Sequence, residues 1–116
     1  MKYLSNAFSL QMIDLKGGSK IYVEPIKAEE VARMDLVSVI GHADTATVVS
    51  DILGKEVACN RQSITLGYGD ELIVAQLTGG RLPEGATTLP EGFQLEFLRV
   101  RVVPEVIPLD QIGGNK

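Results

Sequence analysis

The sequence predicts one domain of the α/β class. Its 116 residues suit a single hydrophobic core rather than two. Short runs rich in Val, Ile and Leu, bounded by Gly and Pro, are typical of strands, and two segments with apolar residues three and four apart are typical of helices. Residues 36–53 give the order strand, turn, helix, which indicates an α/β fold. A chain of this size would gain stability from dimerisation.

The individual elements follow from these patterns. Residues 20–24 place Ile21 and Val23 on one face and predict a half-buried strand that Pro25 ends. Residues 71–77 are nearly all apolar, which predicts a central strand covered on both faces. The predicted strands are residues 2–5, 20–24, 36–40, 62–66, 71–77 and 93–103, and the predicted helices are residues 28–34 and 45–53.

Irregular segments separate and follow these elements. Gly54 is expected to end the second helix. Residues 78–92 hold four glycines and two prolines, which predicts a long loop, and such loops are usually functional lids or disordered. In the last strand the apolar alternation changes phase at Phe97–Leu98, which indicates a bulge. Residues 104–116 are expected to form an irregular tail that covers the core or a partner subunit.

The segment 36–46 holds the only histidine of the chain, His42. Gly41 is expected to free the backbone for a sharp turn, and Asp44 or Thr45 is a suitable N-cap for the following helix. Ligands of α/β folds usually bind at the carboxyl ends of strands, and a helix N-terminus favours anions. His42 would therefore stand beside a phosphate site. A lone histidine in a turn is more often structural, and this segment by itself favours that second interpretation.

Composition and charge exclude several classes of protein. A net charge of −4 argues against a broad basic face that binds long duplex nucleic acid, although a small anionic ligand is compatible with it. No apolar run is long enough for a membrane helix, and a single cysteine, Cys59, favours a reducing cytoplasm. One His and one Cys far apart, with no clustered carboxylates, argue against a metal site, and no cofactor is expected.

With one histidine, one cysteine and no metal site, the chemistry that the sequence allows is acid–base catalysis with one imidazole and a carboxylate. RNA phosphodiesters suit it, because the ribose 2′-hydroxyl is a built-in nucleophile beside the phosphate. The protein must then align that hydroxyl and protonate the leaving 5′-oxygen. A positioned acid of this kind is typically worth about 10²- to 10⁴-fold in rate.

Five segments carry a resemblance to a known family. The segments are Tyr3–Leu10, Ile40–Thr45, Asn60–Arg61, Gly69–Val74 and Arg81–Gly85. In this order and spacing they resemble the viral type III anti-CRISPR ring nucleases and their cellular relatives. The resemblance implies a mixed sheet flanked by short helices, in a homodimer that binds cyclic tetra-adenylate across its two-fold axis. Residues 1–116 would form a single ring-nuclease-like domain, with residues 78–92 as a flexible lid.

The resemblance also implies a reaction and roles for individual residues. The enzyme would be metal-independent, and it would linearise cyclic tetra-adenylate and silence type III CRISPR signalling in the cytoplasm, which would be that of the host if the source is viral. His42 would be the general acid, Glu84 would orient or deprotonate the 2′-hydroxyl, and Arg81 would clamp phosphate. The positions that would contact the ring are Asn6, Ser9, Gln11, Thr45, Arg61, Gln76 and Arg81. Asp44 stands where relatives often carry a hydroxyl residue, and its charge would repel phosphate unless it only caps the helix.

The residues also allow plainer interpretations. Arg61 and Arg81 are equally compatible with solvated surface charges or with partners for the many acids. Glu84 follows Pro83 in a turn-prone loop, where a carboxylate needs no function. Asn6 and Ser9 are natural turn-capping residues.

Two other functions stay open on the sequence. One is a binding protein that captures the ring with little turnover. The other is a small regulator that binds nucleic acid, against which the acidic balance counts.

Overall fold

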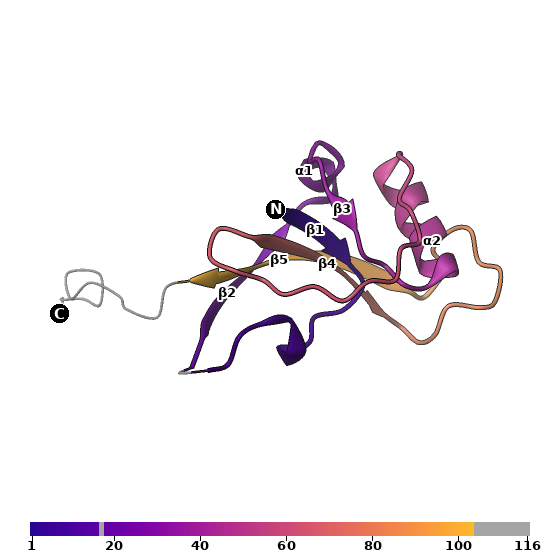
Figure 1. The fold of residues 1–116 in the computed structure, drawn as a ribbon. Helices are drawn as coiled ribbons and strands as arrows, with labels where there is room; N and C mark the ends of the chain where they lie inside the picture. Colours follow the sequence, from indigo (N-terminus) through magenta and orange to yellow (C-terminus); the bar gives the residue numbers. More distant parts are fainter. Residues whose placement is uncertain (17, 104–116) are drawn as a thin grey trace.

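The computed structural model describes residues 1–16 and 18–103, and it contains a five-stranded mixed sheet (Figure 1). The strand order is β2-β5-β4-β1-β3, with β1 parallel to β3 and β4, and β5 antiparallel to β2 and β4. The strands are β1 (Lys2–Ser5), β2 (Lys20–Ile26), β3 (Val37–Ser38), β4 (Glu71–Thr78) and β5 (Gln94–Val103). This small mixed α/β domain confirms the predicted fold class. The tail predicted at residues 104–116 lies outside the described residues.

Helices cover one face of the sheet and an irregular segment covers the other. Figure 1 shows α1 (Ala28–Ala32) and α2 (Ala43–Leu53) on one face and the segment with the short 3-10 helix η1 (Leu10–Met12) on the opposite face. Two apolar clusters result. The cluster under the helices includes Leu4, Val31, Val49, Ile73 and Phe97, and the cluster on the opposite face includes Ile13, Leu66, Leu72, Val100 and Val102.

Helix α2 confirms the predicted amphipathic helix. Ala46, Val49 and Leu53 lie in the cluster under the helices, because residues three and four apart share one side of a helix. Gly54 ends the helix in a left-handed conformation with φ of 70°, as predicted.

Strand β4 is central, as its apolar run predicted. Leu72, Ile73, Val74 and Ala75 are all buried, because the sheet is covered on both faces at this strand.

No membrane-spanning helix occurs within residues 1–16 and 18–103.

The predicted bulge in the last strand is wrong. The pairing of β5 with β4 and β2 runs without a break through Phe97 and Leu98. Leu95 and Phe97 pack toward the helices, whereas Leu98, Val100 and Val102 pack toward the other face. The apolar phase therefore changes because the two ends of one unbroken strand contribute to different apolar clusters.

The second strand differs from the prediction in extent and burial. It continues through Pro25, which pairs with Leu98, to Ile26. Proline is tolerated there because β2 is an edge strand, where a missing N–H can face solvent. Ile21 and Val23 are 38% and 48% exposed, so β2 is more open than the half-buried strand that was expected.

Of two further predicted strands, one is shorter than expected and one is absent. Residues 36–40 were expected to form a buried strand, but β3 spans only Val37–Ser38 and lies at the sheet edge. Residues 62–66 form no strand, and only Leu66 makes an isolated bridge, with Ile13. Just before this segment, the N–H of Asn60 donates to the carbonyl of Ile40 at 2.7 Å.

Candidate functional site

A cavity of about 510 Å³ lies at the carboxyl edge of the three parallel strands. Asn6 directly follows β1, His42 follows β3 by four residues, and Leu77 lies at the end of β4. This is the edge at which α/β sheets place ligands, because loops leave the strands there and helix N-termini point toward it. The lining residues are Asn6, His42, Asp44, Thr45, Leu77, Gly80, Arg81, Leu82 and Glu84.

His42 stands at the start of α2, where it is the N-cap residue. Its carbonyl accepts the first helical hydrogen bond, from the N–H of Ala46 at 3.0 Å. Its imidazole is exposed and makes no hydrogen bond within the described part of the chain. An imidazole that is accessible and uncommitted can donate or accept a proton. The first-turn N–H groups beside it lack acceptors within the helix, which favours an anion here.

The predicted N-cap was wrong by two or three residues. Neither Asp44 nor Thr45 caps α2, because the helix begins earlier, at Ala43. Asp44 instead lies in the first helical turn, and its Oδ2 accepts a hydrogen bond from the N–H of Gly85 at 3.1 Å. The carboxylate thus bonds to the loop between β4 and β5.

Gly41 serves a different purpose from the predicted sharp turn, since its φ is not positive. A Cβ at this position would lie 2.9 Å from Cγ and 3.1 Å from Cβ of Arg61. The glycine is therefore needed for close approach. It allows Arg61 to lie across the backbone next to His42, where both line a second cavity of about 280 Å³ with Asn6 and Gln62.

Side-chain hydrogen bonds fix the segment that carries Arg61. The Ser38 hydroxyl donates to the carbonyl of Ala58 at 2.6 Å, and the Asn60 amide donates to the carbonyl of Ser38 at 2.8 Å. These bonds hold residues 58–60 along the end of β3. They explain why Arg61 reaches His42 although 19 positions separate them in the sequence.

Arg81 and Glu84 reach the first cavity from the loop 79–93 that joins β4 and β5. Both side chains are exposed, and among the described residues neither they nor Arg61 takes part in an ion pair. Within residues 1–16 and 18–103, no acidic side chain forms the ion pair with Arg61 or Arg81 that the plainer interpretation allowed. The cavity brings a cation, a carboxylate and the imidazole of His42 together.

Three of the predicted ring-contacting residues lie elsewhere. Ser9 and Gln11 line neither of these cavities, and the Ser9 hydroxyl accepts the N–H of Gln11 at 3.2 Å. This agrees with the plainer interpretation of Ser9 as a turn-capping residue. Gln76 is exposed beside Val74 and Leu98 in a cavity of about 370 Å³ that Asn6 also borders. Asn6 alone of the predicted residues borders all three cavities.

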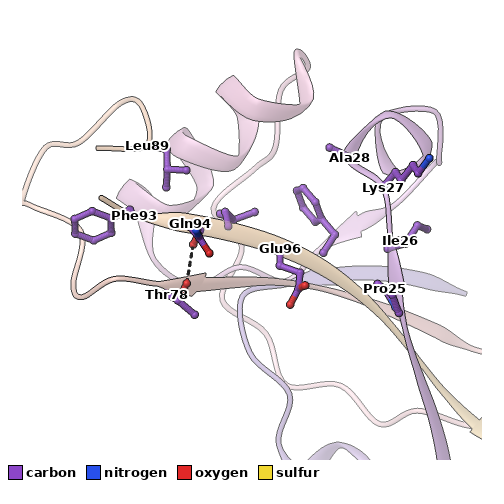
Figure 2. Close-up of a pocket in the computed structure, with 11 residues that line it drawn as sticks. Pro25, Ile26, Lys27, Ala28, Thr78, Leu89, Phe93, Gln94 and Glu96 are labelled. Carbon is purple, nitrogen blue, oxygen red and sulfur yellow. Dashed lines mark hydrogen bonds between the residues drawn. The ribbon is translucent and has the colours of Figure 1, made fainter. Parts of the chain in front are cut away.

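Sequence reasoning missed a larger cavity of about 820 Å³ between the start of α1 and the loop 79–93. Figure 2 shows Leu89, Phe93, Ile26 and Lys27 around it, and none of the predicted site residues lines it. The apolar residues around the end of the long loop were the signal that could have indicated it.

Two side chains with perturbed pKa values lie outside the His42 cavity. A hydrogen bond from Gly67 N–H, together with the amino group of Met1, holds the pKa of the Asp70 carboxyl below its ordinary value. A bond to Glu24, with Nη2 to Oε2 at 2.7 Å, raises the pKa of the Arg99 guanidinium above its ordinary value. Both groups belong to the structure of the sheet rather than to this site. Within the described residues no group of three or more His, Cys, Asp or Glu side chains could hold a metal ion.

Comparison with known proteins identifies viral relatives. The family model described as STIV B116-like matches residues 2–96. Uncharacterized protein ORF117 of Acidianus two-tailed virus is 32% identical over 109 residues, which covers 84% of this chain and 91% of that protein. The structure of B116 of Sulfolobus turreted icosahedral virus shares the fold with a TM-score of 0.69 at 23% identity, covering 86% of this chain and 97% of B116.

Proposed function

The chain belongs to the STIV B116-like family of viral proteins, and we propose that it is a metal-independent ring nuclease that linearises cyclic tetra-adenylate. The observation that carries the proposal is that His42, Arg81 and Glu84 line one cavity at the N-terminus of α2. These are the proton donor, the phosphate-binding cation and the carboxylate that the reaction requires.

The reaction is an in-line transesterification within RNA. The ribose 2′-oxygen attacks the adjacent phosphorus while Glu84 accepts its proton, and the bond from phosphorus to the 5′-oxygen breaks. The His42 imidazolium gives its proton to that departing oxygen. The products are a 2′,3′-cyclic phosphate and a 5′-hydroxyl, so water enters no step. Arg81 and the N–H groups of α2 would stabilise the charge that develops on the phosphate.

The size of the cavity supports a ligand shared between two copies of the chain. A cavity of about 510 Å³ suits one drug-sized ligand, whereas a ring of four nucleotides is larger. Two copies related by a two-fold axis would present two His42 side chains to opposite phosphates of the ring. The cavity beside Arg61 and Asn6 extends the site on each copy.

An exposed apolar surface on the sheet suits the second copy. Ile21 and Val23 of β2 are 38% and 48% exposed on the face that also carries Leu98 and Val100. Asn6 borders both this surface and the His42 cavity, so a homodimer formed here would join the two sites. Exposed apolar patches of this kind often mark protein interfaces.

The proposal is tested by incubating the protein with cyclic tetra-adenylate in a metal chelator. Linear fragments that end in 2′,3′-cyclic phosphate are expected. His42→Ala should slow cleavage by about 10²- to 10⁴-fold while the ring still binds. Glu84→Gln should also slow cleavage, whereas Glu91→Gln is the matched control, because Glu91 is exposed on the same loop but does not line the cavity.

Other outcomes would assign the site differently. A ring that stays intact after long incubation at high enzyme concentration would refute catalysis. Tight binding of an uncleaved ring, altered by His42→Ala only in affinity, would identify a protein that captures the messenger without turnover. A salt-sensitive mobility shift with DNA or RNA, in the absence of ring binding, would instead identify a nucleic-acid regulator.

A further inference from the structure

Asp44 connects two segments that lie far apart in the sequence. Its Oδ2 accepts the N–H of Gly85, 41 positions later, at 3.1 Å. Gly85 has a φ of +80° and directly follows Glu84. The contact is therefore made by the residue next to the proposed catalytic carboxylate, while Asp44 itself is only two residues from His42.

The loop that carries Arg81 and Glu84 has few other hydrogen bonds, although several of its apolar side chains are half-buried. Its remaining hydrogen bonds in the described chain are local, from Ala86 N–H to the carbonyl of Pro83 and from Phe93 N–H to that of Pro90, both at 3.1 Å. Within residues 1–16 and 18–103, the Asp44–Gly85 contact is the one hydrogen bond that joins residues 79–92 to another element.

We infer that Asp44 is a positioning residue that holds the loop 79–93 against α2, so that Glu84 and Arg81 face His42 before the ring binds; this rests on the function proposed above. A carboxylate at this place would by itself repel phosphate. Its acceptance of the Gly85 N–H and its place in the first turn of α2 offset part of that repulsion. Holding reacting groups in place before binding lowers the entropic cost of reaching the transition state.

Amide exchange measures the contact independently of catalysis. Hydrogen exchange of the Gly85 amide is followed by NMR in the wild type and in Asp44→Ala, Asp44→Asn and Asp51→Ala. Asp51 is exposed on the same helix and serves as the matched control. Asp44→Ala should accelerate Gly85 exchange about fivefold to tenfold, as expected for one hydrogen bond. Asp44→Asn keeps an oxygen acceptor and should exchange within about twofold of the wild type.

Cleavage of cyclic tetra-adenylate then tests the positioning role. In Asp44→Ala, kcat should fall about tenfold while KM and the melting temperature stay near wild-type values, and Asp44→Asn should restore kcat. A merely structural role would lower the melting temperature and would leave kcat of the folded fraction unchanged.

The outcomes separate this inference from the proposed function. Wild-type exchange at Gly85 in Asp44→Ala overturns the inference whatever the activity, and so does faster exchange with unchanged kcat. If exchange accelerates but the wild type cleaves no ring, the loop contact stands, while the catalytic part of the inference falls with the ring-nuclease proposal.

Discussion

Substituting Gly41 with alanine tests how the backbone beside His42 places Arg61. The added Cβ would lie 2.9 Å from Cγ of Arg61, closer than side-chain carbons approach in folded proteins, so the arginine must move. Arg61 is exposed and the φ of Gly41 is not positive, so this movement should lower the free energy of unfolding by only about 1 kcal/mol.

The effect on ligand binding should be larger than the effect on stability. If Arg61 contacts a phosphate of the ring, losing that charge-assisted hydrogen bond removes about 1.5–3 kcal/mol of binding free energy. The Kd for cyclic tetra-adenylate should then rise about 10- to 100-fold, which titration calorimetry can measure. In an Arg61→Ala background, Gly41→Ala should have no further effect, because both changes remove the same contact.

Gly67→Ala is the matched control for this experiment. The nearest atom to an added Cβ at Gly67 is Oδ2 of Asp70 at 3.7 Å, an ordinary contact, so binding should not change. A wild-type Kd in Gly41→Ala would refute the reasoning. Costs of Gly41→Ala and Arg61→Ala that add would equally refute it, because the glycine would then act on something other than the arginine.

Three further substitutions test the proposed dimer interface and the stability of the fold. Val23→Asp places a charge on the exposed apolar surface of β2 and should convert a dimer into a monomer that cleaves the ring more slowly. Sedimentation should show the monomer, and circular dichroism should show that it stays folded. A variant that stays dimeric would exclude this surface as the dimer interface. Asp70→Asn should lower the free energy of unfolding by about 1 kcal/mol at pH 7. The hydrogen bond from Gly67 N–H lowers the pKa of Asp70 below 3.8, so its stabilisation is complete above that value and is lost as pH falls through the lower folded pKa. Urea unfolding of Asp70→Asn and wild type should therefore differ at pH 7, and the difference should shrink as acid protonates the Asp70 carboxyl in the folded protein; a difference that does not change with pH would contradict this. Gly79→Ala should lower the free energy of unfolding by about 2 kcal/mol in the same assay. Gly79 has a φ of +110°, and its added Cβ would lie 2.9 Å from Cα of Phe93. Unchanged stability would show that the backbone at the start of the loop 79–93 can shift.

The sequence by itself determined the elements whose signals are local. The apolar run at residues 71–77 predicted a central strand, and the spacing of Ala46, Val49 and Leu53 predicted the buried face of α2. These signals work because side-chain direction follows the period of the backbone. The position of His42 at a carboxyl edge was also a local prediction, because strand, turn and helix follow one another directly in the chain.

Tertiary structure decided which distant segments meet. Pro25 is tolerated because β2 is an edge strand, and the phase change at Phe97–Leu98 reflects two different apolar clusters rather than a bulge. No local sequence pattern shows whether a strand lies at the edge or the centre of its sheet, or which apolar cluster packs against each end of it.

The same division applies to the candidate site. Histidine at a strand-to-helix junction could be read from neighbouring residues, but the contacts of Gly41 with Arg61 and of Asp44 with Gly85 could not. These contacts depend on how chain segments 20 and 41 positions apart pack together, which the backbone period does not encode. Sequence therefore placed the imidazole, and only the packed fold brought Arg61, Arg81 and Glu84 to it.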